Sequence, residues 1–306
     1  MSLRLSMEWL GSCSGCEIAF LNIGENLISL LTQDFEVVHA PLLMDNKYNR
    51  QEGDGLRLPQ ADVGIVTGGV NNEEHLEILL EMRRQCTYLI ALGTCATHGG
   101  IPALMNSMDQ QQCWQEIFQT RGTDSGAAVP DVEVPAPLER VFGCDEKATI
   151  DLLVPGCAPN PHIIEEVLNS QVQQRAPVIP GRSVCDTCPV IRKGKGDIAR
   201  VKRFLENADY DKDEPHSSMR CLLEQGFLCL GPVTLAGCAN NGVPSCIAAR
   251  VPCRGCYGPV RKGGNQMLDM MNAMVSNGID YKSVIDRRSI LRFTGAHGRL
   301  RPLKKG

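Results

Sequence analysis

The sequence predicts an α/β protein in which a flavodoxin-like domain with a parallel sheet, residues 1–178, precedes a smaller loop-rich domain, residues 179–306. Two observations support this. Up to about Ser170, short apolar runs alternate with longer amphipathic ones, a pattern typical of strands and helices that follow each other in a parallel sheet. From Arg182 onward cysteine, glycine and proline dominate, and the stretch Pro177–Gly181, PVIPG, interrupts any periodic pattern.

Each element of the first domain follows from its local pattern. Short β-rich apolar runs predict strands at Leu3–Leu10, Phe35–His39, Val63–Val66, Tyr88–Leu92 and Ile150–Val154. Longer runs with apolar residues at helical spacing predict helices at Ser14–Leu31, Glu73–Arg84, Gln110–Gln119 and Pro161–Gln171. Because strands and helices alternate, we expect a parallel sheet covered on both faces. Gly122–Gly143, rich in small residues and proline, is expected to be a long surface connection.

The second domain has little periodic apolar sequence. Helices are predicted at Asp197–Asn207 and Gln266–Val275, and loops elsewhere. Modules of this kind usually need a metal to hold them together, because their apolar core is too small.

Composition excludes several classes of protein. The chain has 306 residues, with 31 Lys and Arg against 35 Asp and Glu, a net charge of −4. No sustained basic stripe is interleaved with aromatics, so we expect no nucleic-acid partner. No apolar stretch approaches the roughly 18 residues of a membrane span, and the start, MSLRLSMEWLGSCSGCE, lacks the features of an export signal. We therefore expect a cytoplasmic protein without a membrane span.

Fifteen cysteines are far more than packing alone would call for. Proteins with a disulfide framework are usually short secreted chains with an even number of cysteines, whereas this chain is long and has an odd number of them. The count therefore favours metal ligation.

Four of the cysteines follow strands of the predicted sheet. Cys13 and Cys16 follow the first strand, Cys95 follows Tyr88–Leu92, and Cys157 follows Ile150–Val154. Ligands of such folds bind beyond the carboxyl ends of the strands, so these four thiols are expected to meet at one edge. Iron built into clusters prefers thiolate ligands, and a cubane cluster takes four of them.

Eight further cysteines lie within 72 residues and would serve two more clusters. They are Cys185, Cys188, Cys221, Cys229, Cys238, Cys246, Cys253 and Cys256. Their Cys-x-x-Cys pairs also suit a zinc site or a thioredoxin-like redox pair, so spacing alone leaves these alternatives open. Cys86 and Cys113 are expected to be packed thiols, and the role of Cys144 stays open.

Motifs along nearly the whole chain resemble those of nickel-iron hydrogenase small subunits. The first half contains Cys13-Ser-Gly-Cys16-Glu17, Gly93-Thr-Cys95-Ala and Pro155-Gly-Cys157-Ala-Pro-Asn-Pro161. The second half contains Cys185-Asp-Thr-Cys188-Pro, Arg220-Cys221-Leu-Leu-Glu, Cys229-Leu-Gly-Pro-Val-Thr and Cys253-Arg-Gly-Cys256. The type that they resemble is the cytoplasmic, methyl-viologen-reducing one associated with heterodisulfide reductase (gamma subunit). A similar first half occurs in the cluster-carrying subunit of complex I, which lacks the eight later cysteines.

The resemblance implies three clusters. A proximal cluster in the first domain would be bound by the proximal set, Cys13, Cys16, Cys95 and Cys157. A distal cluster would be bound by the distal set, Cys185, Cys188, Cys221 and Cys229, and a medial cluster by the medial set, Cys238, Cys246, Cys253 and Cys256. Many periplasmic members have His where this chain has Cys185 and lack the fourth medial ligand that Cys246 supplies. We therefore expect three 4Fe-4S clusters.

The resemblance also implies a function and its partners. The nickel-iron centre would belong to a separate large subunit, and this chain would relay electrons from it to a downstream electron-accepting subunit, an iron-sulfur or flavin protein. Glu17 is a possible proton-transfer residue, or a carboxylate stabilised by the helix dipole. His98 is expected to be a solvated or simply packed histidine rather than a donor to the cluster. The alternatives are an iron-sulfur adaptor subunit of another cytoplasmic oxidoreductase complex and a zinc-stabilised interaction module.

Overall fold

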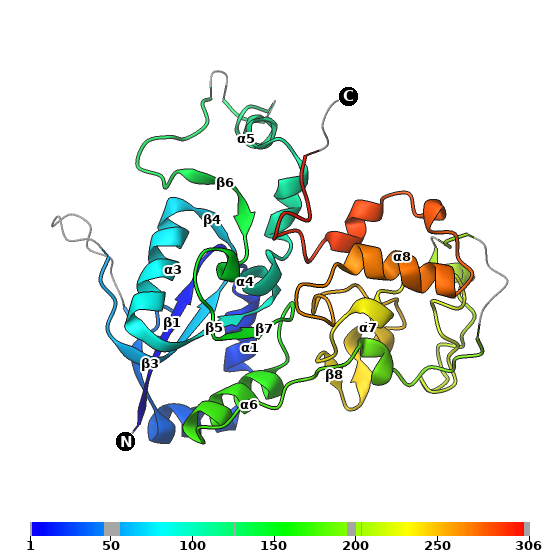
Figure 1. Cartoon of the computed structure of the whole chain (residues 1–306), viewed down its shortest axis with the longest axis horizontal. Helices are drawn as coiled ribbons and strands as arrows, with labels where there is room; N and C mark the ends of the chain where they lie inside the picture. Colours follow the sequence, from blue (N-terminus) through cyan, green and yellow to red (C-terminus); the bar gives the residue numbers. More distant parts are fainter. Residues whose placement is uncertain are drawn as a thin grey trace. The chain divides into compact units, whose positions relative to one another are not determined.

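The computed structural model describes residues 2–45, 56–120, 122–124, 127–194, 200–202 and 204–302. The chain divides into two compact units. The first comprises Met1–Val178 together with Arg292–Gly306, and the second comprises Ile179–Leu291 (Figure 1).

A five-stranded parallel sheet forms the centre of the first unit, in the order β2-β1-β3-β5-β7. Its strands are β1 Leu3–Trp9, β2 Phe35–His39, β3 Ala61–Thr67, β5 Cys86–Leu92 and β7 Leu152–Val154. Ile65 lies beside Met7 on one side and Ile90 on the other, so the central strands are apolar along their length. The predicted flavodoxin-like sheet is confirmed.

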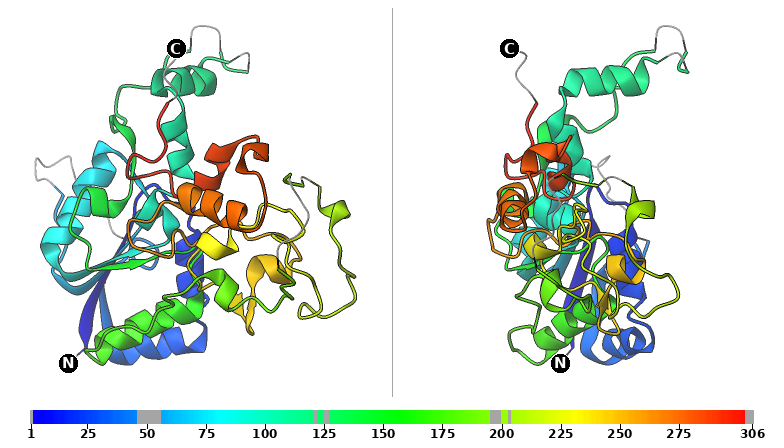
Figure 2. Two further views of the ribbon diagram at one scale, coloured as in Figure 1. Left: turned by 45° about the vertical axis from the view of Figure 1, so that its right-hand side comes forward. Right: turned by 90° about the vertical axis from the view of Figure 1, so that its right-hand side faces the viewer.

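Helices cover both faces of this sheet (Figure 1). They are α1 Gly15–Leu21, α2 Glu25–Ser29, α3 Glu73–Gln85, α4 Thr94–His98 and α6 Pro161–Val172, and a further helix of this unit is α5 Gln110–Phe118. A π-helical turn, Leu30–Asp34, follows α2, and 3₁₀ turns lie at Pro102–Ser107 and Cys144–Glu146. The single helix predicted over Ser14–Leu31 is wrong, because Gly24 takes a φ of +83° between α1 and α2. Figure 2 shows α5 well away from the strands of the sheet.

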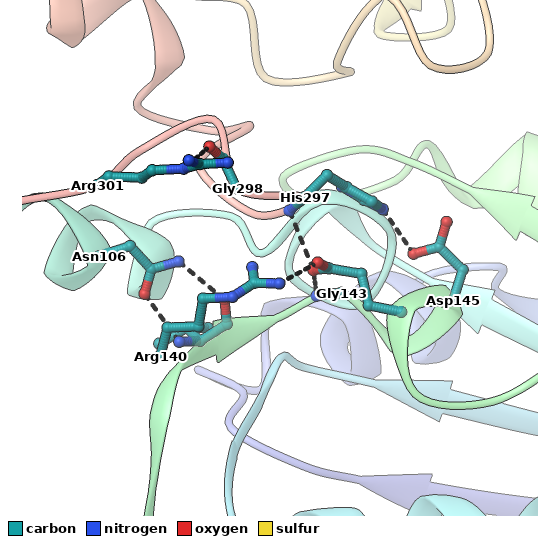
Figure 3. A network of polar contacts seen from close by, with 9 residues as sticks. Asn106, Arg140, Gly143, Asp145, His297, Gly298 and Arg301 are labelled. Atoms are coloured by element: carbon teal, nitrogen blue, oxygen red, sulfur yellow. Dashed lines mark hydrogen bonds and ion pairs between the residues drawn. The ribbon is translucent and has the colours of Figure 1, made fainter.

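A second, two-stranded sheet pairs β4 Val70–Asn72 with β6 Pro137–Phe142 in antiparallel fashion. The expected surface connection over Gly122–Gly143 is therefore wrong for its last part. The Asn106 side chain donates to the Val141 carbonyl at 2.8 Å and accepts from the Val141 N–H at 2.8 Å (Figure 3). An amide side chain thus pairs with β6 as a neighbouring strand would, and this long-range contact has no local signal in the sequence.

The segment Arg292–Pro302 belongs to the first unit, although the sequence pattern predicts it in the second domain. Thr294 forms a β-bridge with Gly100, and the Ala296 N–H donates to the His98 carbonyl at 3.1 Å. The segment is therefore held against α4 by backbone pairing.

The second unit has few regular elements among its described residues. They are α7 Ser245–Ala248, α8 Gln266–Ser276, the short strands β8 Ala239–Asn240 and β9 Val243–Pro244, and 3₁₀ turns at Val184–Asp186, Leu205–Asn207, Gly231–Val233, Tyr281–Ser283 and Arg287–Leu291. The predicted helix Gln266–Val275 is confirmed as α8. Asn265 caps its N-terminus, because the Asn265 side chain accepts a hydrogen bond from the Met267 N–H at 3.0 Å.

The other helix predicted here, Asp197–Asn207, lies partly outside the described residues. In the described part it is wrong, because only Leu205–Asn207 turns, as a 3₁₀ helix, and the Lys202 N–H donates to the Gly226 carbonyl at 2.8 Å. Among the residues that the structure describes, no helix has the length and apolarity needed to span a membrane.

Candidate metal centre

The proximal set lies at the carboxyl edge of the parallel sheet. Cys13 and Cys16 follow β1, Cys95 lies in α4 directly after β5, and Cys157 follows β7. The four thiols lie close enough to interact electrostatically: the pKa of Cys16 is raised by burial, then by Glu17, and then by Cys95, Cys157 and Cys13. The structure therefore brings these four cysteines together.

Two glycine-bearing turns allow this approach. Gly93, with a φ of +91°, has no room for a side chain, because a Cβ would lie 2.2 Å from the Cys16 Sγ. The Thr94 N–H donates to the Gly156 carbonyl at 2.9 Å, and the Gly156 N–H donates to the Thr94 hydroxyl at 2.8 Å. These reciprocal bonds join the loop that carries Cys95 to the loop that precedes Cys157.

The thiols of the proximal set fit a metal cluster chemically. All are free, Cys16 is buried, and Cys13 and Cys157 are exposed, so the set opens on the surface of its unit. Burial, followed by Cys157 and Cys13, raises the pKa of Cys95 to about 11, so the metal-free thiol is protonated at neutral pH. A bound iron cluster would reverse this preference, because its positive charge stabilises thiolates. Within the described ranges, no three His, Cys, Asp or Glu side chains are grouped so as to hold one metal ion.

Glu17 is buried beside this set, at 3% exposure. Its carboxylate accepts a hydrogen bond from the Thr67 hydroxyl, and the Ser12 hydroxyl lies within 3.4 Å of its other oxygen. Glu17 thus connects the end of β3 to the turn before Cys13, a contact that its place in the first turn of α1 did not indicate.

A second buried carboxylate lies in the sheet and was not predicted from the sequence. Glu8 and His39 are 4% and 3% exposed, and the Glu8 Oε2 lies 2.6 Å from the His39 Nε2. The one indication of this buried carboxylate in the sequence was an acidic residue inside the predicted strand Leu3–Leu10.

A polar network surrounds the helix that carries Cys95 (Figure 3). The His297 Nε2 lies 2.9 Å from the Asp145 Oδ1, and the His297 N–H donates to Glu146 at 3.0 Å. Glu146 also accepts from the Arg140 guanidinium at 2.7 Å. The His98 ring meets the His297 ring edge-on at 6.3 Å, so His98 is packed, as expected.

In the second unit, the distal set lines one cavity. Cys185, Cys188, Cys221 and Cys229 all contribute to a cavity of about 360 Å³. Burial raises the pKa of Cys185 to about 12, with further contributions from Cys229, Cys221 and Cys188, while Arg192 opposes them. The four thiols are therefore electrostatic neighbours.

The medial set is linked in the same way. Burial raises the pKa of Cys253, with contributions from Cys229, Cys246 and Cys256, and Cys246 raises the pKa of Cys238. The Cys253 N–H donates to the Cys229 Sγ at 3.3 Å, and Cys253 also lines the cavity of the distal set. Cys253 thus lies where the medial and distal sets meet.

The remaining cysteines are packed thiols. Cys86, in β5, and Cys113, in α5, are both buried. Cys144 is buried with its Sγ 3.7 Å from the Gly68 carbonyl oxygen, and burial raises its pKa.

Comparisons with known proteins agree with this arrangement. Residues 13–170 match the family described as NADH ubiquinone oxidoreductase, 20 Kd subunit. One component of the F420-non-reducing hydrogenase of Methanothermobacter marburgensis is 32% identical, over 93% of this chain and 87% of that protein. Its counterpart in the F420-non-reducing hydrogenase vhu of Methanocaldococcus jannaschii is 31% identical, over 96% and 95%.

Among solved structures, the crystal structure of an NAD+-reducing NiFe-hydrogenase in the H2-reduced state contains a similar chain. It has a TM-score of 0.52 and 30% identity, and the match covers 59% of this chain and 96% of that one. The chain therefore belongs to the NADH ubiquinone oxidoreductase 20 Kd subunit family, as a small subunit of the nickel-iron hydrogenase kind.

Proposed function

We propose that this chain is an electron-transfer subunit that binds three 4Fe-4S clusters and no nickel. It would relay electrons from the nickel-iron site of a partner large subunit to a downstream redox partner, in the cytoplasm. The observation that carries the proposal is that twelve free cysteines are electrostatic neighbours, four at the edge of the sheet in the first unit and eight in the second. The division of these eight into the distal and medial sets follows the resemblance of their motifs.

We propose that the partner large subunit binds the surface of this chain beside the proximal set. Cys13 and Cys157 are exposed, and Ile18, directly after Cys16 and Glu17, is 57% exposed. An exposed large apolar side chain beside exposed thiols is typical of a surface that another subunit covers.

When bound, each cluster would accept and release one electron at a time. The protein's own part is to hold the thiolates, exclude water and supply hydrogen bonds to sulfur. The Thr94 and Gly156 bonds fix the loops of the proximal set, and the Cys253 N–H to Cys229 Sγ bond connects the medial set to the distal set.

Glu17 would assist proton movement beside the proximal set. Its carboxylate lies between the Thr67 hydroxyl and Ser12, and Ser12 is half-buried, so these groups form a short polar route toward the surface. We expect Glu17→Gln to lower hydrogen turnover while the iron content of the chain stays unchanged.

Metal analysis of the natively isolated, anaerobic protein with its co-purifying subunits tests the proposal first. About twelve irons per chain and about one nickel in a bound large subunit would support it, at four irons per cubane. Iron at this level without nickel would favour an adaptor subunit of another oxidoreductase complex. Zinc in place of iron would overturn both.

The medial set is tested by Cys246→Pro. Cys246 is the second residue of α7, and backbone N–H groups in the first turn of a helix have no partner within it, so proline removes a ligand there without removing a hydrogen bond of the helix. We expect the medial cluster to become a 3Fe form with a new EPR signal and a higher potential. Cys113→Ala, at a packed thiol in none of the three sets, is the control. An unchanged spectrum of Cys246→Pro would contradict the medial assignment.

A further inference from the structure

Charge is divided unevenly between the two units. Residues 179–291 carry 16 Lys and Arg against 11 Asp and Glu, a net charge of +5. The rest of the chain carries 15 against 24, a net charge of −9. The unit that holds the distal and medial sets is therefore the basic part of an acidic chain, and such a field attracts partners of opposite charge.

Exposed cations flank the distal set. Arg182, Arg192 and Lys193 are all exposed and lie within a few residues of Cys185. The Arg192 guanidinium donates to the Cys185 carbonyl and lines the same cavity as the thiols. A positive charge is therefore fixed beside the place where electrons would leave the chain.

The two acidic side chains near these cations accept hydrogen bonds from backbone and hydroxyl groups. The Asp186 carboxylate accepts from the Ser183 N–H at 2.9 Å and from the Ser183 hydroxyl at 2.8 Å. Glu224 is buried and accepts from the backbone N–H groups of Lys193 at 2.7 Å and Gly194 at 3.0 Å. The hydrogen bonds from Ser183, and then the charges of Arg182 and Arg192, lower the pKa of Asp186. The side chains of Arg182, Arg192 and Lys193 are nevertheless exposed to solvent.

A second cavity adjoins the cavity of the distal set. It has a volume of about 560 Å³ and shares Ser183, Asp186 and Pro232 with the first, while Arg182 and Arg261 also line it. Arg261 is paired with Asp269 at 3.1 Å, but its side chain is 78% exposed. Asp186 and Asp269 also line this hollow, so the excess of positive charge comes from the exposed cations around it, Arg182, Arg192 and Lys193. The hollow has room for side chains of a partner.

We propose that these four residues, Arg182, Arg192, Lys193 and Arg261, form a basic rim that docks an electron-accepting protein through an acidic surface. The proposal rests on the proposed function, because it assigns a role to the distal set. Complementary charge at such a site mainly speeds encounter and sets partner choice. The rate of electron exit should therefore depend on salt and on the charge of the acceptor.

The test measures hydrogen oxidation by the complex of this chain with its large subunit, freed of the electron-accepting subunit, with two acceptors, anionic ferricyanide and a cationic viologen. Each hydrogen molecule oxidised gives two protons and reduces two one-electron acceptors, so the rates compare directly. In the double variant Arg192→Glu, Lys193→Glu, we expect the ferricyanide rate to fall by about tenfold at low ionic strength and the viologen rate to rise. High salt should shrink both differences.

Two controls separate charge from structure. Lys212→Glu makes a like change at an exposed residue that lines neither cavity, and should leave the ratio of the two rates unchanged. Arg192→Lys keeps the charge but replaces the guanidinium that bonds the Cys185 carbonyl, and should preserve the preference for the anion. Iron content and EPR spectra show whether each variant keeps its clusters.

The partner itself is tested by carbodiimide cross-linking of the native complex, which joins amines to carboxylates. We expect Lys193 to be linked to an Asp or Glu of the electron-accepting subunit, and the link to be lost at high salt. Equal changes with both acceptors, no salt dependence, or cross-links only from other lysines would overturn the basic rim. A native protein without iron would instead overturn the proposed function.

Discussion

The first unit contains a five-stranded sheet whose strands and covering helices bury an aliphatic core, whereas the second has only two short strands, α7, α8 and 3₁₀ turns as regular elements in its described residues. The cluster of buried side chains around Leu79 and Leu89 contains, as far as the structure describes the chain, none of the proximal set. In the second unit, Cys229 and Cys253 belong to the core itself, together with Met270. The proximal set of the first unit thus lies outside this apolar cluster, whereas cysteines of the distal and medial sets are part of the apolar cluster of the second unit.

The largest expected effect is the loss of the second unit when iron is removed. Because its core includes cysteines of two sets, iron removal should cost this unit on the order of several kcal/mol of stability. Hydrogen exchange followed by mass spectrometry, on the complex before and after chelation, should show lost protection in α8 and retained protection in β3 and β5. Equal losses in both units would contradict the comparison.

The first unit should instead be destabilised by a substitution at a residue that is not a proposed cluster ligand. Glu8→Ala leaves His39 buried without its carboxylate partner, and should lower the free energy of unfolding by about 3 kcal/mol with iron content unchanged. Chemical denaturation measures the loss. Arg4→Ala, which removes a largely exposed ion pair with Asp62 at 3.7 Å, should cost less than about 1 kcal/mol. A similar cost for both variants would show that the buried pair adds nothing.

Between these extremes, Gly93→Ala should damage the proximal set while most of the sheet survives. The added Cβ would lie 2.2 Å from the Cys16 Sγ, and we expect a loss of about four irons per chain, with about 2 kcal/mol of destabilisation. Gly24→Ala is the matched control, because its φ of +83° is also strained but nothing lies within 4 Å of its Cβ. If both variants keep their iron, the close approach at Gly93 has no role in the site.

The difference between the two units also decides what could be predicted from the sequence. The parallel strands have short β-rich apolar stretches, most continuous in β5, and the cysteines that follow the strands lie at one edge because parallel strands end together. The sheet and the grouping of the proximal set therefore follow from local pattern. The ribbon of β4 and β6 was missed because its partner strand and Asn106 lie far away in sequence. In the second unit, helical spacing at Asp197–Asn207 was misleading, since backbone pairing of Lys202 with Gly226 prevails there.

Contacts between residues far apart in the sequence were harder to predict than the strands and helices. Glu8 gave no sign of its partner, because His39 lies on the next strand of the sheet. The return of Arg292–Pro302 to the first unit depends on long-range pairing, as between Thr294 and Gly100 and between Ala296 and His98. These features depend on which elements become neighbours, and that is decided by the whole fold.

The smallest expected effect is an acid sensitivity of the first unit through His98. Burial, followed by Arg299 and His297, lowers the pKa of His98 to about 4, whereas an unfolded histidine titrates near 6.5. Neutral His98 therefore contributes stability that is fully present above about pH 6.5 and is lost as the pH falls toward 4. Asp145, which acts on His98 in the opposite sense, is bonded to His297 at 2.9 Å and does not cancel the effect.

His98→Gln should remove this part of the pH dependence, because glutamine stays neutral. Unfolding of the wild type and the variant, measured from pH 7.5 to 4.5, should give curves that converge as the pH falls. His162→Gln, at a side chain that is 86% exposed, should leave the curve of the wild type unchanged. A constant difference between the wild type and His98→Gln would mean that His98 is held by packing alone.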